Sequence, residues 1–170
     1  MANLRNRSGF WIEATSSYNK FNEKNVSKEV RERYVVEAAT FIDGETKIRK
    51  EMDYNNRPIK VPAMMKPKYG EICFSDDAAA ENFYKVKVCI SEDVEVRTRK
   101  GGTRTKTKVV SHIHLVQAAS NEDARRAVVE EVYKNSNADY EIADVVKTRI
   151  LDVLENDKHL KTLAGEHEQN

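Results

Sequence analysis

An internal repeat constrains the fold of this chain more than any other feature of its sequence. Val36-Glu-Ala-Ala-Thr40 returns 80 residues later as Val116-Gln-Ala-Ala-Ser120. Two shorter matches flank this pair in the same order, Phe10-Trp11-Ile12 with Phe83-Tyr84-Lys85-Val86 and Tyr69-Gly-Glu-Ile72 with Tyr140-Glu-Ile142. Self-similarity at a long, nearly fixed spacing is typical of a duplicated structural unit. The sequence therefore predicts two copies of one module.

Each half has the pattern strand, strand, helix, strand. Alternating apolar residues predict the strands, and Thr40 and Ser120 are suited to cap the helices because their hydroxyls can accept from free amides of the first turn. The predicted first-half elements span residues 10–19, 29–38, 41–53 and 69–74, after a proline-rich extended connector at 55–68. In the second half the strands span 83–92, 106–118 and 140–146, with an extension toward Val153, and the helix follows Ser120 with Ala124, Ala127, Val128 and Val132 toward the core.

These elements predict the α+β class. One three-stranded sheet with one helix buries little surface, so we expect two ββαβ repeats fused in one domain with a mainly antiparallel sheet and both helices on one face. The other face would be open. The expected boundaries are an N-terminal extension at 1–9, repeats at 10–74 and 83–154, and a charged tail at 155–170.

Composition narrows the class of protein. The 170 residues include 29 Lys and Arg against 28 Asp and Glu, and no stretch approaches the roughly 20 apolar residues that a membrane span needs. No secretion-signal pattern is present, and Cys73 and Cys89 are too few for a disulfide framework. We expect a cytoplasmic protein with free thiols.

One basic stretch stands out against this balanced charge. Residues 97–108 contain six cations and no acid, which leaves 23 basic and 28 acidic residues elsewhere. Gly101 and Gly102 lie at its centre between two predicted strands, so we expect a long hairpin arm that can follow a phosphate backbone. The alternatives are another anionic partner, or a solvated tip whose charges deter edge pairing. The candidate cations are Arg97, Arg99, Lys100, Arg104, Lys106 and Lys108.

Aromatic residues on the open sheet face could stack on bases. Strand parity places Phe83 with Lys85 and Lys87, and Tyr84, Val86, Val88 and Ile90 on the opposite, core-facing side. Trp11 is a second outward-facing candidate. The alternative is that Trp11 and Phe83 fill a seam between the halves or a homodimer interface.

No catalytic, metal or cofactor site is predicted. His112 and His114 share one strand face, but two imidazoles fall short of the four ligands of a structural zinc site. The acidic pairs lack the cluster of carboxylates expected of a magnesium-dependent nuclease. No P-loop or nucleophile elbow is present.

The chain also resembles a domain family of unknown function found in small proteins of gut anaerobes and their phages. The similarity covers residues 10–154 and implies a shared fold but no activity. The basic stretch is longer here than in the family pattern, so no family role is carried over to it. The segments that carry the resemblance are Phe10-Trp11-Ile12-Glu13, Tyr34-Val35-Val36-Glu37-Ala38, Glu71-Ile72-Cys73-Phe74, Phe83-Tyr84-Lys85-Val86-Lys87-Val88, Leu115-Val116-Gln117-Ala118-Ala119 and Tyr140-Glu141-Ile142-Ala143.

Together these features predict a non-enzymatic nucleic-acid-binding protein that prefers single strands. It would use the basic arm and the open sheet face, in the host cytoplasm if a phage encodes it. The alternative is a phage or accessory interaction protein that binds a host protein or sequesters an anionic nucleotide. A structural role in a particle or oligomer is a third possibility.

Overall fold

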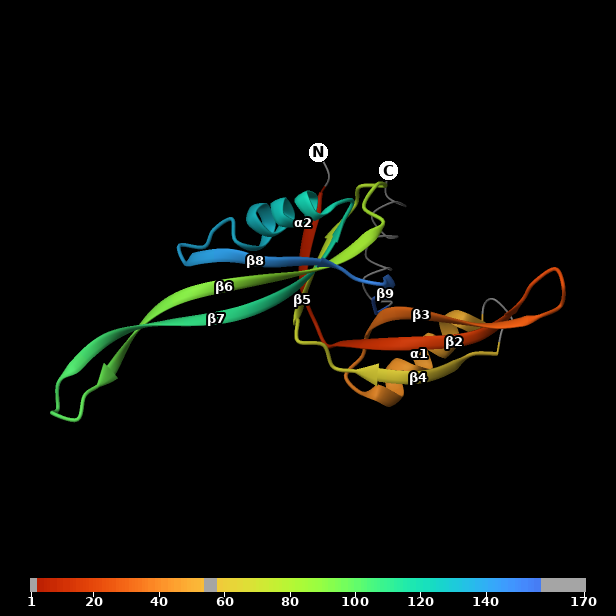
Figure 1. Ribbon diagram of the computed structural model, residues 1–170, viewed down its shortest axis with the longest axis horizontal. Coiled ribbons are helices and arrows are strands. Elements are labelled where there is room, and N and C mark those ends of the chain that lie inside the picture. The colour runs from red at the N-terminus through yellow and green to blue at the C-terminus, as the bar shows by residue number, and fades with distance from the viewer. Residues whose placement is uncertain (1–2, 54–57, 157–170) are drawn as a thin grey trace, which may run out of the picture. The chain divides into compact units, whose positions relative to one another are not determined.

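The computed structural model describes residues 3–53 and 58–156, which form two compact units (Figure 1). Of the described residues, unit 1 is built from 3–8 and 69–148, and unit 2 from 9–53, 58–68 and 149–156. Each described unit has one sheet and one helical segment packed against it. The α+β class is confirmed. The expected single sheet is wrong, because the described strands form separate sheets of five and four strands.

Unit 2 contains a four-stranded mixed sheet in the order β4-β2-β3-β9. The hairpin β2–β3 is flanked by β4, antiparallel to β2, and by β9, parallel to β3. Helix α1 contacts the central two strands. The elements are β2 (Trp11–Phe21), β3 (Ser27–Glu37), α1 (Phe41–Asp53), β4 (Lys60–Met65) and β9 (Ile150–Leu154).

Helix α1 begins and packs as its sequence predicts. The Thr40 hydroxyl accepts a hydrogen bond from the Asp43 amide at 3.2 Å, and the helix buries Ile48 and Met52 in the core of unit 2. Gly44, which lowers helix propensity, faces the sheet. A Cβ there would lie 3.0 Å from Cε of Met64, so the glycine lets helix and sheet approach closely.

Unit 1 contains a five-stranded mixed sheet in the order β1-β5-β7-β6-β8. The long hairpin β6–β7 is flanked by β8, antiparallel to β6, and by β5, parallel to β7, while β1 pairs with β5. Helix α2 contacts β6, β7 and β8. The elements are β1 (Leu4–Ser8), β5 (Glu71–Ser75), β6 (Asn82–Arg97), β7 (Thr103–Ala118), α2 (Asn121–Ala127), the π-helical segment η1 (Val128–Val132) and β8 (Asp139–Lys147).

The core of unit 1 confirms the predicted strand parity and helix stripe. Tyr84, Val86 and Val88 of β6 are buried against the helical segment. Ala124, Ala127 and Val128 are buried in the same cluster, and Val132 and Ile90 pack against it. The Ser120 hydroxyl accepts from the Asp123 amide at 3.2 Å, as Thr40 does in α1.

Two strands were not expected. Residues 60–65 form β4 although Pro62 lies within them, because β4 is an edge strand where a missing amide hydrogen is tolerated. Residues 4–8 form the edge strand β1 and are more than an extension. From residue 157 onward, the charged tail expected at 155–170 lies outside the described residues.

The units do not coincide with residues 10–74 and 83–154, because two strands pair outside their own half. β5 follows β4 in sequence but pairs with β7, and β9 follows β8 but pairs with β3. Tyr69–Ile72 and Tyr140–Ile142 therefore lie at different places: β5 is a parallel neighbour of the hairpin, and β8 is an antiparallel one. In the described ranges, no helix combines the length and apolar character needed to cross a bilayer.

Two isoleucines of α1 allow a matched test of this packing. Ile48 is fully buried, whereas Ile42 is 78% exposed. Replacement by alanine makes the same change of helix propensity at both positions, but it leaves a cavity in the core only at Ile48. Ile48→Ala should lower the free energy of unfolding of unit 2 by about 2–5 kcal/mol. Ile42→Ala should change it by less than about 0.5 kcal/mol. Urea denaturation measures both, and equal effects would contradict the placement of α1.

Candidate nucleic-acid interface

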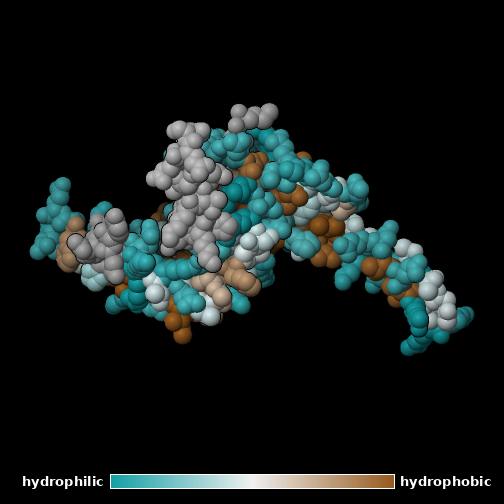
Figure 2. All heavy atoms as spheres, turned by 180° about the vertical axis from the view of Figure 1, so that it is seen from behind, coloured by the Kyte–Doolittle hydropathy of each residue, from teal (hydrophilic) through white to brown (hydrophobic). Residues whose placement is uncertain are grey.

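The predicted basic hairpin is present, and it extends beyond the rest of its sheet (Figure 1). The pairing of β8 with β6 ends at Ser91, and β5 pairs with β7 at Leu115 and Val116. In the described part of the chain, residues 92–108 therefore form ladders only with each other. We call these residues the arm. In Figure 2 the arm extends to the right, and hydrophilic residues flank apolar ones along its length.

A tight turn closes the arm. The Thr98 amide donates to the Gly102 carbonyl at 2.7 Å, and the Gly101 amide donates to the Thr98 carbonyl at 3.1 Å. The Thr98 hydroxyl donates to the Gly102 carbonyl at 3.0 Å and lies 3.1 Å from the Gly102 amide. Gly101 has a φ of +83°, a conformation that glycine adopts without steric cost. These contacts fix the register of the two strands.

The register places three cations on one face. Directly opposed residues of antiparallel strands point to the same side, and side chains alternate along each strand. Arg104 lies opposite Val96, Lys106 opposite Val94, and Lys108 opposite Glu92. These six residues form what we call the basic face. Successive cations on it are two residues apart, roughly 7 Å along the strand.

The other face of the arm is not basic. There Thr103, Thr105 and Thr107 lie opposite Arg97, Glu95 and Asp93, and the Thr107 hydroxyl donates to Oδ1 of Asp93 at 2.9 Å. The sequence reasoning missed these acids because they precede the basic stretch. Together with Glu92, these acids oppose the six cations of the arm, so its net charge is +3. The glycine turn could have revealed them, since it fixes which residues pair.

All six candidate cations are exposed. Arg104, Lys106 and Lys108 lie on the basic face, Arg97 lies on the other face, and Arg99 and Lys100 lie in the turn. The structure thus brings five of the six together on one side or at the end of the arm. Exposed cations at this density can displace counterions from a polyanion.

The candidate aromatic rings are not available for stacking. Phe83 is 3% exposed and Trp11 is 4% exposed, so the outward position that base stacking needs is wrong for both rings. The alternative, that they fill a seam between the halves or a homodimer interface, stays a prediction. Parity placed Phe83 correctly on the side away from Tyr84, but parity alone does not report burial. Lys87 is exposed, whereas Lys85 is half-buried with Nζ 5.6 Å from the centre of the Tyr69 ring. A buried ring offers no face to a base.

The two histidines of β7 have different environments. Nε2 of buried His114 lies 2.9 Å from the Tyr133 hydroxyl, and Nδ1 lies 3.7 Å from a Glu71 carboxylate oxygen. Burial lowers the pKa of His114, and the nearby Glu71 charge opposes this shift. His112 is exposed. No three His, Cys, Asp or Glu side chains of the described residues come together as metal ligands would.

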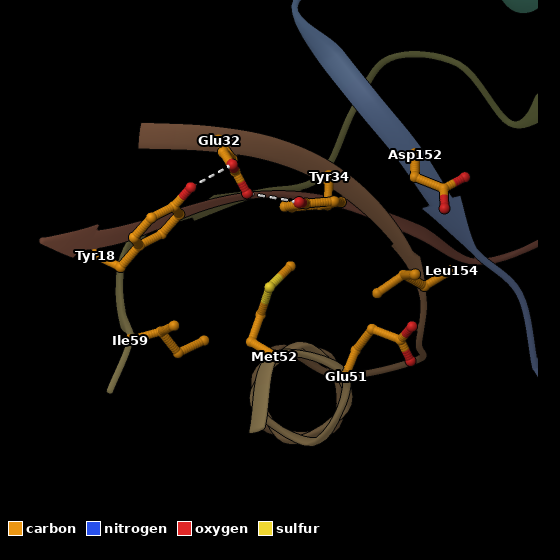
Figure 3. Close-up of a pocket in the computed structure, with 8 residues that line it drawn as sticks. All are labelled: Tyr18, Glu32, Tyr34, Glu51, Met52, Ile59, Asp152 and Leu154. Carbon is orange, nitrogen blue, oxygen red and sulfur yellow. Dashed lines mark hydrogen bonds between the residues drawn. The ribbon is translucent and has the colours of Figure 1, made fainter. Parts of the chain in front are cut away.

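A second candidate site is a hollow in unit 2 of about 320 Å³ (Figure 3). Glu32 accepts hydrogen bonds from the hydroxyls of Tyr18 at 2.9 Å and Tyr34 at 2.7 Å. Burial and the Glu32 carboxylate raise the pKa of Tyr34. The lining residues are Tyr18, Glu32, Tyr34, Glu51, Met52, Ile59, Asp152 and Leu154.

The charge of this hollow limits what it can bind. Three carboxylates, those of Glu32, Glu51 and Asp152, line it, and the described lining residues include no lysine or arginine. Phosphate groups would be repelled there, because like charges without a neutralising partner are unfavourable at short range. The hollow is therefore a poor place for an anionic nucleotide. The arm remains the better candidate for binding a polyanion.

His114 generates a pH prediction. Because folding lowers its pKa below 6.5, the unfolded chain takes up a proton near that pH that the folded unit does not. The free energy of unfolding of unit 1 should therefore fall on acidification from about pH 7 to about pH 5. His114→Gln should remove this part of the pH dependence. His112→Gln, on the exposed neighbour, should retain most of it, because burial is the largest cause of the lowered pKa of His114 and the charge of His112 contributes less. Urea titrations at several pH values measure the difference, and unchanged pH dependence in His114→Gln would contradict the assignment.

Comparison with known proteins gives the family and no activity. The chain matches no curated protein and no solved structure. The matching family description names neither organism nor function, so an origin in gut anaerobes or their phages stays a prediction. The match covers residues 10–156, which include the whole of the range 10–154 that carries the sequence resemblance. The chain belongs to the family described as Domain of unknown function (DUF4494).

Proposed function

We propose that this protein binds nucleic acid, without catalysing a reaction on it, through the basic face and the turn of the arm. One observation carries the proposal: Arg104, Lys106 and Lys108 are exposed on one face of a hairpin that leaves its sheet. Cations spaced along an exposed arm can each approach a phosphate, and the released counterions favour binding.

The expected preference for single strands depended on Phe83 and Trp11. Both rings are buried, so the proposal keeps the arm and does not include base stacking on the sheet. The alternative of nucleotide sequestration loses support from the acidic lining of the hollow in unit 2. Binding of an acidic host protein by the arm remains the alternative that the experiment below separates.

We also infer that the chain is a duplication of one ββαβ module. In each unit the strand of the long sequence match leads into a helix whose capping hydroxyl accepts from the amide three residues on. In each, the strand after the helix pairs antiparallel with the first hairpin strand. The hairpin strands have 11 residues in unit 2 and 16 in unit 1, so the arm is an addition to the second copy. A feature of one copy alone is a natural place for a binding function.

The triple change Arg104→Gln, Lys106→Gln and Lys108→Gln tests the proposed function. Fluorescence anisotropy with labelled oligonucleotides, repeated at several salt concentrations, gives the slope of log affinity against log salt. Removal of three phosphate contacts should weaken binding and reduce that slope by about two to three, because each contact releases about 0.7–0.9 counterion.

A matched control removes the same charge elsewhere. Lys20, Lys24 and Lys28 are exposed around another hairpin, that of β2 and β3. Their replacement by glutamine should leave the slope unchanged. Equal slopes for the arm triple and the wild type would exclude the arm from binding. Absence of binding to any nucleic acid at low salt would leave the acidic protein partner.

A further inference from the structure

We infer that the ligand of the arm is duplex DNA in the B form, and that the arm enters its major groove with the basic face inward. This inference rests on the proposed function and names the class of nucleic acid. It is carried by the shape of the arm, by the absence of rings in it and by the distribution of charge between its faces.

The shape of the arm fits one groove. Six directly opposed pairs, from Glu92–Lys108 to Arg97–Thr103, form a two-stranded ribbon roughly 20 Å long. Such a ribbon is one of the few elements that the major groove of B-DNA, about 12 Å wide, admits. The major groove of A-form RNA is too narrow and deep for side chains to read. The ribbon therefore favours duplex DNA over duplex RNA.

The composition of the arm disfavours single strands. Residues 92–108 contain no Phe, Tyr, Trp or His. Proteins that bind single strands stack bases on such rings, at roughly 1–3 kcal/mol per base. The rings predicted to do so, Phe83 and Trp11, are buried. The arm offers charge and hydrogen bonds without a stacking surface, which suits a duplex whose bases are already stacked.

The charges orient the arm in the groove. The basic face combines three cations with one acid, Glu92, and includes the half-buried Val94 and Val96. Long cationic side chains can reach guanine edges or flanking phosphates, and apolar side chains can contact thymine methyl groups in the same groove. The opposite face combines one cation, Arg97, with two acids, Asp93 and Glu95, so its net charge is negative and phosphates would be repelled from it. The basic face therefore points toward the bases.

The closing experiment compares three ligands of one length and sequence: duplex DNA, single-stranded DNA and duplex RNA. The wild-type chain should bind duplex DNA at least about tenfold more tightly than either of the others. Bulky substituents at C5 of the pyrimidines, which project into the major groove, should weaken binding at least about tenfold. Equal or tighter binding of single strands, or indifference to the substituents, would overturn the inference. Lack of binding to all three ligands would overturn the proposed function as well.

Two matched variants test the orientation. Val96 and Thr103 lie in adjacent pairs, opposite Arg104 and Arg97, but on different faces. Val96→Glu and Thr103→Glu each place one acid across from an arginine. Val96→Glu should weaken duplex binding at least about tenfold and Thr103→Glu less than about threefold. Equal losses, in variants that circular dichroism shows to be folded, would overturn the inward placement of the basic face.

Discussion

The backbone pairing of β6 with β7 determines where every charge of the arm lies. The turn from Thr98 to Gly102 sets this pairing through its hydrogen bonds and the left-handed conformation of Gly101. A slip of one residue in either strand would move its side chains to the other face. Three cations would then no longer share a side with Val94 and Val96. The candidate interface is thus a consequence of register more than of composition.

An isolated two-stranded hairpin is marginally stable in water, so the arm depends on the sheet from which it extends. The same two strands continue into the core of unit 1, where Tyr84, Val86, Val88 and Val116 are buried against the helical segment. Burial of these side chains fixes the strands at their root. The exposed end can then contain charged and polar residues almost exclusively. The buried root of the hairpin therefore stabilises the fold, and its exposed end provides the proposed binding surface.

The sequence alone allowed prediction of the elements that depend on local chemistry. The bounds of α1, the capping by Thr40 and Ser120, the helix stripe and the core parity of β6 agree with the structure, because spacing and caps determine them directly. The hairpin at the basic stretch followed from the glycine pair between alternating strands. Long-range pairing was not predictable in this way. The Tyr69–Ile72 segment indicates a strand, but no short match says that it pairs with β7.

The candidate site was predicted only in part, because some of its residues come together through cross-strand pairing. Charge can be counted along a chain, so the cations were found, whereas Asp93 and Glu95 enter the site only through cross-strand register. Strand parity separates two faces but does not say whether a face is covered. It therefore left open whether Phe83 and Trp11 are exposed, as base stacking needs, or buried, as the structure has them. β4 was not predicted because three nearby prolines indicate an extended connector. The structure places β4 at the edge of its sheet, where Pro62 is tolerated because its missing amide hydrogen is not needed for pairing.

The most direct measurement is the change in backbone amide NMR shifts of the isotopically labelled chain on titration with a DNA oligonucleotide. If the arm is the binding surface, the largest changes should fall within residues 92–108 and should weaken as salt is added. Amides at the root of the hairpin, such as those of Val86 and Val88, should change little. Changes confined to residues outside the arm, with residues 92–108 unaffected, would contradict the account.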